Sequence, residues 1–266
     1  MKKFALLFLL FVWVLPGVVQ AQLFSREVDP QQVIDDARKT LDEMVRHPDY
    51  EALVADLQTA KGVLIFPRVV RGGFFVGGSG GLGVFMAWDE ARGDYSPVAF
   101  YSLGSVSLGI QFGGEVAEVI IVARTQNAVD SMFANVFRLG GDASVAAGPV
   151  GAGRSATITA DFLSYARSQG AFLGMSLEGS RLRIRDDFNE AFYGQKLRPV
   201  HIIEGRQVDN PGTHALREEL ARLRAQPAAP MQEPEPAQDD WLQQLPQPVE
   251  PGTGGLTIEE LEAESI

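Results

Sequence analysis

Two glycine-rich signatures of enzyme loops overlap in one short stretch, GGFFVGGSGGLGVF, at residues 72–85. Residues 78–83 spell G-x-G-x-x-G, the pattern with which dinucleotide-binding proteins hold a pyrophosphate. Residues 77–81 spell G-x-S-x-G, the turn that presents a nucleophilic serine in many hydrolases, here Ser79. Both patterns require a helix directly after the glycines. The residues that follow, VFMAW, favour a strand instead, so we expect a hairpin in which glycines supply positive φ angles.

The other residue types that could do chemistry form no catalytic or metal-binding pattern. The chain has no cysteine, which excludes disulfides, thiolate metal sites and a cysteine nucleophile. Four carboxylates lack the spacing of a calcium loop and stand near arginines, which favours salt bridges; they are Asp161, Glu178, Asp186 and Asp187. The histidines downstream of Ser79 are His201 and His214, and both lie in polar surroundings. We predict no enzyme, no cofactor, no metal and no catalytic residue, and keep a serine hydrolase using Ser79 as the weakest alternative.

A basic segment gives the clearest candidate for binding. Arg181, Arg183 and Arg185 alternate with Leu182 and Ile184, which on a strand would place three guanidinium groups on one face. Arginine forks match the oxygens of a phosphate. The alternative, that these arginines pair with the acidic residues that follow them, stays open. Three further basic residues beside the first predicted strand complete the candidate lipid-binding set, namely Lys61, Arg68 and Arg71.

Charge and hydropathy divide the chain into three parts. Residues 1–21 combine two lysines, a short apolar run and a small-residue end, and predict a signal peptide that directs the protein to the periplasm or cell envelope. Residues 225–266 contain nine acidic and no basic residues and predict a disordered Pro/Gln-rich tail. The domain between them, residues 22–224, has 21 basic and 25 acidic residues, which argues against a nucleic-acid partner.

Periodicity gives the expected elements of that domain. Helical spacing predicts helices over residues 30–46, 50–60 and 125–138 and a helical turn or two over 187–193. Short apolar or alternating runs predict strands at 63–66, 74–76, 82–88, 98–103, 106–112, 119–122, 143–147, 156–162, 170–178 and 182–184. Strands do not alternate regularly with long helices. We therefore expect a single α+β domain of curved antiparallel sheets, with N-terminal helices and one central helix packed outside.

Four motifs occur in an order typical of one family: KGVLIFPRVVRGGFFVGGSGGLGVF, YSPVAFYSLGSVSLGIQFGGEVAEVIIVART, LGGDASVAAGPVG and ADFLSYARSQGAFLGMSLEGSRLRIRDDFNEAFYG. Over residues 38–194 the chain resembles the SYLF domain, the actin-binding domain of yeast actin-patch proteins. The resemblance implies binding of anionic lipids, phosphoinositides in eukaryotic members, and of actin in some. The signal peptide argues against actin as a partner here. We expect a secreted, non-enzymatic protein that binds anionic phospholipid or a membrane surface; the alternative is an envelope scaffold that holds a protein partner.

Overall fold

The computed structural model describes residues 28–73, 76–108, 113–150, 159–168 and 177–226. The predicted signal peptide, the tail from residue 227 onward and most of the strand predicted at 170–178 lie outside these residues. The strand predicted at 156–162 is wrong within the described residues, because residues 159–161 are not in a strand and β8 begins only at Phe162. In chain order the elements are α3 (Pro30–Val45), η1 (Pro48–Tyr50), α4 (Glu51–Thr59), β1 (Gly62–Gly73), β2 (Val76–Asp89), β3 (Asp94–Tyr95), β4 (Ala99–Leu108), β5 (Gly113–Ala123), α5 (Gln126–Ser131), β6 (Val136–Arg138), β7 (Val145–Ala147), β8 (Phe162–Ser168), β9 (Arg181–Ile184), α6 (Asp186–Tyr193), α7 (Pro199–Ile203), η2 (Pro211–Thr213) and α8 (His214–Ala225).

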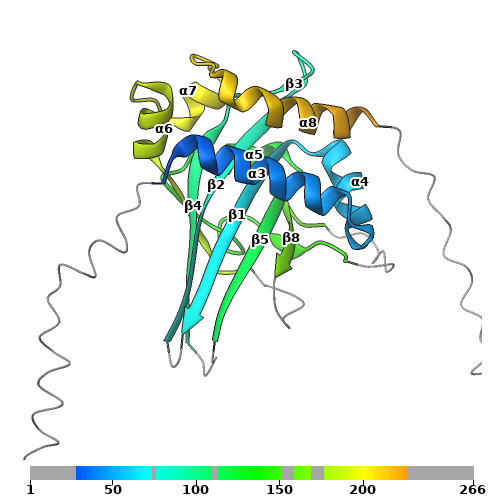
Figure 1. Cartoon of the computed structure of the whole chain (residues 1–266), viewed down its shortest axis with the longest axis vertical. Helices are drawn as coiled ribbons and strands as arrows, with labels where there is room; N and C mark the ends of the chain where they lie inside the picture. The colour runs from blue at the N-terminus through cyan, green and yellow to red at the C-terminus, as the bar shows by residue number, and fades with distance from the viewer. Residues whose placement is uncertain (1–27, 74–75, 109–112, 151–158, 169–176, 227–266) are drawn as a thin grey trace, which may run out of the picture. The chain divides into compact units, whose positions relative to one another are not determined.

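The strands form one sheet in the order β6-β9-β4-β2-β1-β5-β8-β7, with β3 paired to β2. All of these pairs are antiparallel except β7 with β8. The long strands β1, β2, β4 and β5 run from beneath the helices and extend well beyond them (Figure 1). The expectation of an α+β domain built on curved antiparallel strands is confirmed.

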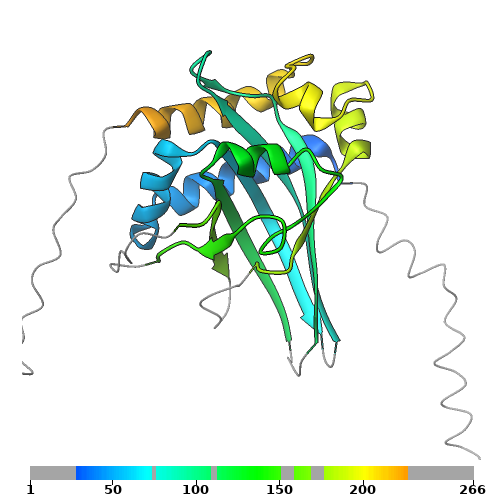
Figure 2. The ribbon, with the colours of Figure 1, turned by 180° about the vertical axis from the view of Figure 1, so that it is seen from behind.

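The sheet curls so that its two ends approach each other. Its first and last strands in spatial order, β6 and β7, are consecutive in sequence, and the segment between them makes a bridge from Leu139 to Ala143. The rings of Phe137 on β6 and Phe162 on β8, near opposite ends of the strand order, lie 5.5 Å apart between centroids. The face that carries these rings is therefore concave, and the opposite face is convex (Figure 2).

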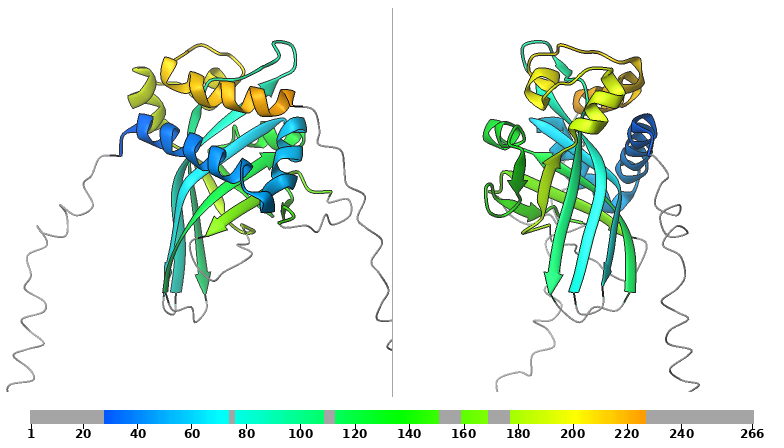
Figure 3. Two further views of the ribbon diagram at one scale, coloured as in Figure 1. Left: turned by 45° about the vertical axis from the view of Figure 1, so that its right-hand side comes forward. Right: turned by 90° about the vertical axis from the view of Figure 1, so that its left-hand side faces the viewer.

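The helices α3, α4 and α8 pack on the convex face, outside the curl (Figure 3). Helix α3 begins at Pro30 behind the cap Asp29, whose carboxylate accepts a hydrogen bond from the amide of Gln31. Its apolar stripe, from Val33 to Met44, is buried against the sheet. Both helices predicted at the N-terminal end are confirmed. No helix within the described residues is both long and apolar enough to cross a membrane.

A second apolar core fills the concave face. It joins side chains of every long strand to α5 and α7, and Phe66, Phe85, Tyr101, Phe137 and Phe162 are among its largest members. Burial raises the pKa of the Tyr101 phenol far above its ordinary value, and the hydroxyl donates a 2.7 Å hydrogen bond to the carbonyl of Met132. Burial of these apolar side chains on one face favours the curled form of the sheet.

The helix predicted over residues 125–138 is wrong in its second half. The predicted cap is correct, since the Thr125 hydroxyl accepts a hydrogen bond from the amide of Ala128 at 3.1 Å. The helix ends at Ser131, however, and residues 136–138 form β6, which pairs with β9. Pairing with a strand more than forty residues away places Phe137 in the concave core, so tertiary packing overrides the local helical pattern.

From the sequence we predict no helices in the C-terminal part of the domain, where the structure has α7 and α8. His201 lies on α7 and His214 on α8. Leu216, Leu220 and Leu223 on α8 are buried at helical spacing against α3 and α4, so a usable signal was present in the sequence.

The glycine stretch forms the hairpin of β1 and β2, as expected, but the reason for its glycines differs. Among the described glycines, those with positive φ are Gly93, Gly140, Gly179 and Gly194, all outside this stretch. The register of β1 and β2 shifts between Ile65 and Arg68, opposite Gly83. A Cβ on Gly83 would stand 2.4 Å from the carbonyl oxygen of Ile65, so this glycine permits close approach of two strands.

Candidate functional site

The arginine alternation predicted from the sequence lies on the convex face. Strand β9 pairs with β4 on one side and β6 on the other, and Arg181 and Arg183 are exposed while Leu182 between them is buried. Strand β6 adds a residue that the sequence analysis missed, because Arg138 stands directly opposite Arg181. These three side chains, Arg138, Arg181 and Arg183, are called the arginine patch.

Among the residues that the structure describes, the arginine patch differs from most other arginines of the domain in its lack of ion pairs, and the nearby carboxylate of Asp142 accepts a hydrogen bond from the backbone amide of Arg138 at 2.7 Å. None of its guanidinium groups forms an ion pair there, although most other arginines of the domain do. Like charges placed directly opposite each other on neighbouring strands are destabilising. An anion bound between Arg138 and Arg181 would relieve that repulsion.

Arg185 does not join the patch. It lies beyond the end of β9, and its guanidinium donates two hydrogen bonds to Asp187, at 2.8 and 2.6 Å. It also stacks 4.3 Å above the ring of Phe188. The pairing lowers the pKa of the Asp187 carboxyl. Only two of the three alternating arginines therefore share a face, and for Arg185 the salt-bridge alternative is correct.

The other three basic candidates are not brought together. Lys61 lies at the helix-covered end of β1 and pairs with Glu90 at 2.7 Å. Arg68 is exposed on the convex face in the same cross-strand row as Arg183, but β2 and β4 lie between their strands and the curl turns the two apart. Arg71 lies on the concave face, in the row that follows Val69 of the core.

Arg71 belongs to a row of polar side chains on the concave face. The register places Arg71 opposite Ser79 on one side and opposite Glu115 on the other, and Ser79 opposite Ser105. All four side chains are half-buried. These four residues are called the polar row.

Ser79 has no general base within hydrogen-bond reach among the described residues. Its hydroxyl lies 2.7 Å from the hydroxyl of Ser105, and it stands within a strand rather than on a strand-to-helix turn. His214, the first residue of α8, instead has its Nε2 atom 2.8 Å from a carboxylate oxygen of Asp209. Neither the hydrolase pattern nor the dinucleotide pattern has the local structure that its chemistry requires.

Two of the acidic candidates, Asp161 and Asp187, have structural partners. The carboxylate of Asp161 accepts hydrogen bonds from the hydroxyls of Ser144 at 2.7 Å and Thr125 at 3.1 Å, which lower its pKa. No group of three or more potential metal ligands occurs within the part of the chain that the structure describes.

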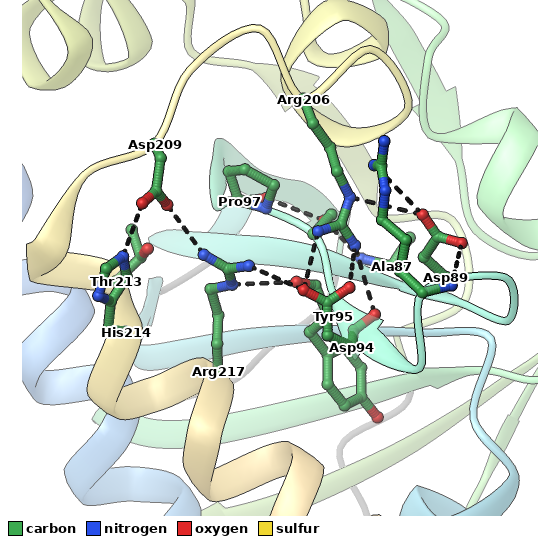
Figure 4. A network of polar contacts seen from close by, with 12 residues as sticks. Ala87, Asp89, Asp94, Tyr95, Pro97, Arg206, Asp209, Thr213, His214 and Arg217 are labelled. Carbon is green, nitrogen blue, oxygen red and sulfur yellow. Dashed lines mark hydrogen bonds and ion pairs between the residues drawn. The ribbon is translucent and has the colours of Figure 1, made fainter.

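A second polar network fastens the C-terminal segment to the sheet (Figure 4). The carboxylate of Asp94 accepts hydrogen bonds from Arg206, at 2.6 and 3.0 Å, and from Arg217 at 3.3 Å. Arg217 also bonds the carbonyl of Tyr95 and the carboxylate of Asp209. The side chains of Arg206 and Arg217 are only 12% and 16% exposed, and Asp94 bridges these two largely buried guanidinium groups, which also pair with Asp89 and Asp209 respectively.

Asp94→Ala is therefore expected to lower the free energy of unfolding by about 2 kcal/mol, because it leaves both arginines without this partner. Urea denaturation of the purified domain would measure the change. The control is Asp130→Ala on α5, whose carboxylate accepts a bond from Gln126 at an exposed site and should cost no more than about 0.5 kcal/mol. Equal effects of the two changes would contradict this role for Asp94.

The chain is similar in sequence to known proteins. A family model described as "Ysc84: Las17-binding protein actin regulator" matches residues 104–223. The chain is 33% identical over 157 residues to LAS seventeen-binding protein 3 of Saccharomyces cerevisiae, covering 56% of this chain and 34% of the yeast protein. It is 32% identical over 151 residues to SH3 domain-containing YSC84-like protein 1 of Homo sapiens, covering 55% and 44% respectively. No solved structure matches significantly.

The chain thus spans less than half the length of these curated relatives. Both are named as binding or SH3-containing proteins rather than as enzymes. The resemblance seen in the four sequence motifs is confirmed: the chain is similar to the Ysc84, or SYLF, family, whose model matches residues 104–223.

Proposed function

We propose that this protein is a secreted or periplasmic, non-enzymatic protein that binds the anionic headgroups of phospholipids through the arginine patch. The observation that carries the proposal is that, within the described residues, the guanidinium groups of Arg138, Arg181 and Arg183 on one exposed face form no ion pair. A fold that pairs most of its other arginines leaves these three available to an external anion.

The physical basis is short-range and electrostatic. Guanidinium groups bind phosphate oxygens with paired hydrogen bonds. Each arginine near an anionic membrane surface contributes about 1 kcal/mol of attraction, which salt screens within a Debye length. Three such residues give reversible binding, which suits a peripheral protein.

Flotation with liposomes tests the proposal. Replacing Arg181 and Arg183 together by Gln should weaken binding to anionic vesicles by roughly thirtyfold, from the loss of about 2 kcal/mol. Binding of the unaltered protein should also fall as salt is raised from low to moderate concentration. Neutral vesicles without anionic lipid serve as the reference.

The matched control is Arg185→Gln. It removes the same charge four residues beyond Arg181, but from a guanidinium already paired with Asp187. It should leave vesicle binding nearly unchanged. The proposal fails if anionic and neutral vesicles both remain unbound, or if Arg185→Gln weakens binding as much as the double replacement.

The second candidate function is a scaffold of the cell envelope that holds a protein partner. The names of the relatives favour it, since the yeast protein is described as binding another protein. Helix α8 ends at Ala225, so a chain that stops after Gln226 retains every described element. Removal of residues 227–266 should abolish tail-mediated partner binding and leave lipid binding intact.

A further inference from the structure

The polar row lies where the concave core ends. Val69, Leu103 and Ala117 form the last buried row of that core, on strands β1, β4 and β5. Two residues further along each strand, side chains on the same face are polar: Arg71, Ser105 and Glu115, with Ser79 between the first two on β2. The concave face therefore changes from apolar to charged within one row.

The carboxylate of Glu115 has an unsatisfied hydrogen-bond acceptor. Its Oε1 atom is buried and has no hydrogen-bond partner. Arg71 stands directly opposite it on β1, yet within the described part of the chain these two side chains do not form an ion pair. A buried carboxylate oxygen without a donor is costly, and opposite charges on neighbouring strands ordinarily pair. The site holds a cation-binding and an anion-binding group side by side, and neither satisfies the other.

The strand register places the four groups side by side on the concave face of β4, β2, β1 and β5. Directly opposed residues of an antiparallel pair have Cα atoms about 4.5–5.5 Å apart. A ligand that satisfies both charges must therefore carry a positive and a negative group separated by a short linker.

We propose that the polar row binds a phosphoethanolamine group. The ammonium donates to Glu115, the phosphate oxygens accept from Arg71, and the hydroxyls of Ser79 and Ser105 donate to the remaining phosphate or glycerol oxygens. This site lies on the opposite face of the sheet from the arginine patch. It adds recognition of a zwitterion to the proposed binding of anionic headgroups, and it does not depend on that binding.

Calorimetric titration of the mature protein with soluble compounds tests the site. Glycerophosphoethanolamine should bind at least tenfold more tightly than glycerophosphate, which lacks the ammonium. It should also bind more tightly than glycerophosphocholine, whose quaternary nitrogen has no N–H to donate. Glu115→Gln should abolish the first preference, and Arg71→Gln should abolish binding of all three compounds.

Two controls keep these results interpretable. Arg68→Gln removes a charge from the same strand but on the convex face, and should leave binding unchanged. Glu115→Gln retains the shape of the side chain and removes an unsatisfied charge, so its melting temperature should not fall. Equal affinities for the three compounds in the unaltered protein would overturn the proposal, as would unchanged binding by Glu115→Gln.

Vesicles distinguish the lipid from its free headgroup. With Arg181 and Arg183 changed to Gln, flotation on phosphatidylethanolamine but not phosphatidylcholine vesicles would identify the lipid as the ligand. Binding of glycerophosphoethanolamine without flotation would identify the soluble headgroup. If the unaltered protein binds glycerophosphoethanolamine but does not float with anionic vesicles, only the arginine patch is contradicted. If it floats with anionic vesicles but does not bind glycerophosphoethanolamine, only the polar row is contradicted.

Discussion

Gly83→Ala is expected to destabilise the domain by about 3 kcal/mol or to prevent soluble expression. The added Cβ would lie 2.4 Å from the carbonyl oxygen of Ile65 and 2.4 Å from Cδ1 of Phe66. The carbonyl belongs to the β1–β2 ladder beside the register shift, and the Phe66 ring is fully buried, so neither can move cheaply. Overpacking of a filled interior ordinarily costs about 1–3 kcal/mol, and a clash with backbone lies at the upper end. Thermal and urea denaturation would give the value.

Gly80→Ala is the matched control in the same strand. Its Cβ would point to the convex face, where the nearest heavy atom, the carbonyl oxygen of Leu103, lies 3.8 Å away. The change should be neutral or stabilise by about 0.5 kcal/mol, because alanine restricts the unfolded chain. Similar tolerance at both positions would show that strand spacing does not explain the glycine at position 83.

Arg167→Met is expected to lower the free energy of unfolding by about 2–3 kcal/mol. Arg167 on β8 forms ion pairs with Glu43 on α3 and with Glu118 on β5, the latter at 2.5 Å. Thr40 on α3 donates a 3.0 Å hydrogen bond to the same Glu118. Removing the cation leaves two carboxylates facing each other between helix and sheet. The side chains of Arg167 and Glu118 are 28% and 20% exposed, so the cost falls somewhat below that of breaking a fully buried pair.

Lys39→Met provides the control for that change. Lys39 pairs with Glu43 at 3.7 Å on the surface of the same helix, and its side chain is 73% exposed. An exposed pair of this kind contributes less than about 0.5 kcal/mol. If the two variants unfold at the same urea concentration, the ion pairs of Arg167 do not hold α3 on the sheet.

The same ion pairs predict a dependence of stability on pH. The hydrogen bond from Arg167 lowers the pKa of the Glu43 carboxyl below its ordinary value of 4.5. Because the folded pKa is the lower one, this stabilisation is present above pH 4.5 and is lost as the pH falls through the folded value. Urea midpoints measured from pH 7 to pH 3 should therefore fall less in Arg167→Met than in the unaltered protein.

Local signals predicted most of the fold. Asp29 and Pro30 mark the start of α3, and its apolar spacing matches the stripe that is buried. The run of apolar residues at 119–122 lies within β5 at the centre of the sheet. The sequence could not reveal where the curl closes, because that depends on pairing between β6 and β9, which lie more than forty residues apart. A helical pattern at 132–138 was therefore misleading.

In the candidate site, too, local features could be predicted and features that depend on long-range pairing could not. Alternation alone placed Arg181 and Arg183 on one face, since strand geometry fixes it locally. The sequence could not show that Arg138 belongs to the arginine patch, because this depends on the register of β6 against β9. It could not show that Arg185 lies outside the patch, because this depends on β9 ending at Ile184. Glu115 gave no signal at all, because its significance comes from burial and from the neighbours that other strands supply.

The closure of the sheet also has a consequence for the order of folding. Strands β1 and β2 form a local hairpin, whereas β4 must wait for β9, which follows it by more than seventy residues. Pairings between distant segments form late, because the entropy of closing a long loop must be overcome first. Until β9 is made and docked, β4 presents an unpaired edge to other chains in the cell. Nascent or refolding molecules are therefore most exposed to misassembly at β4, and a chaperone that shields this edge would raise the yield of native protein.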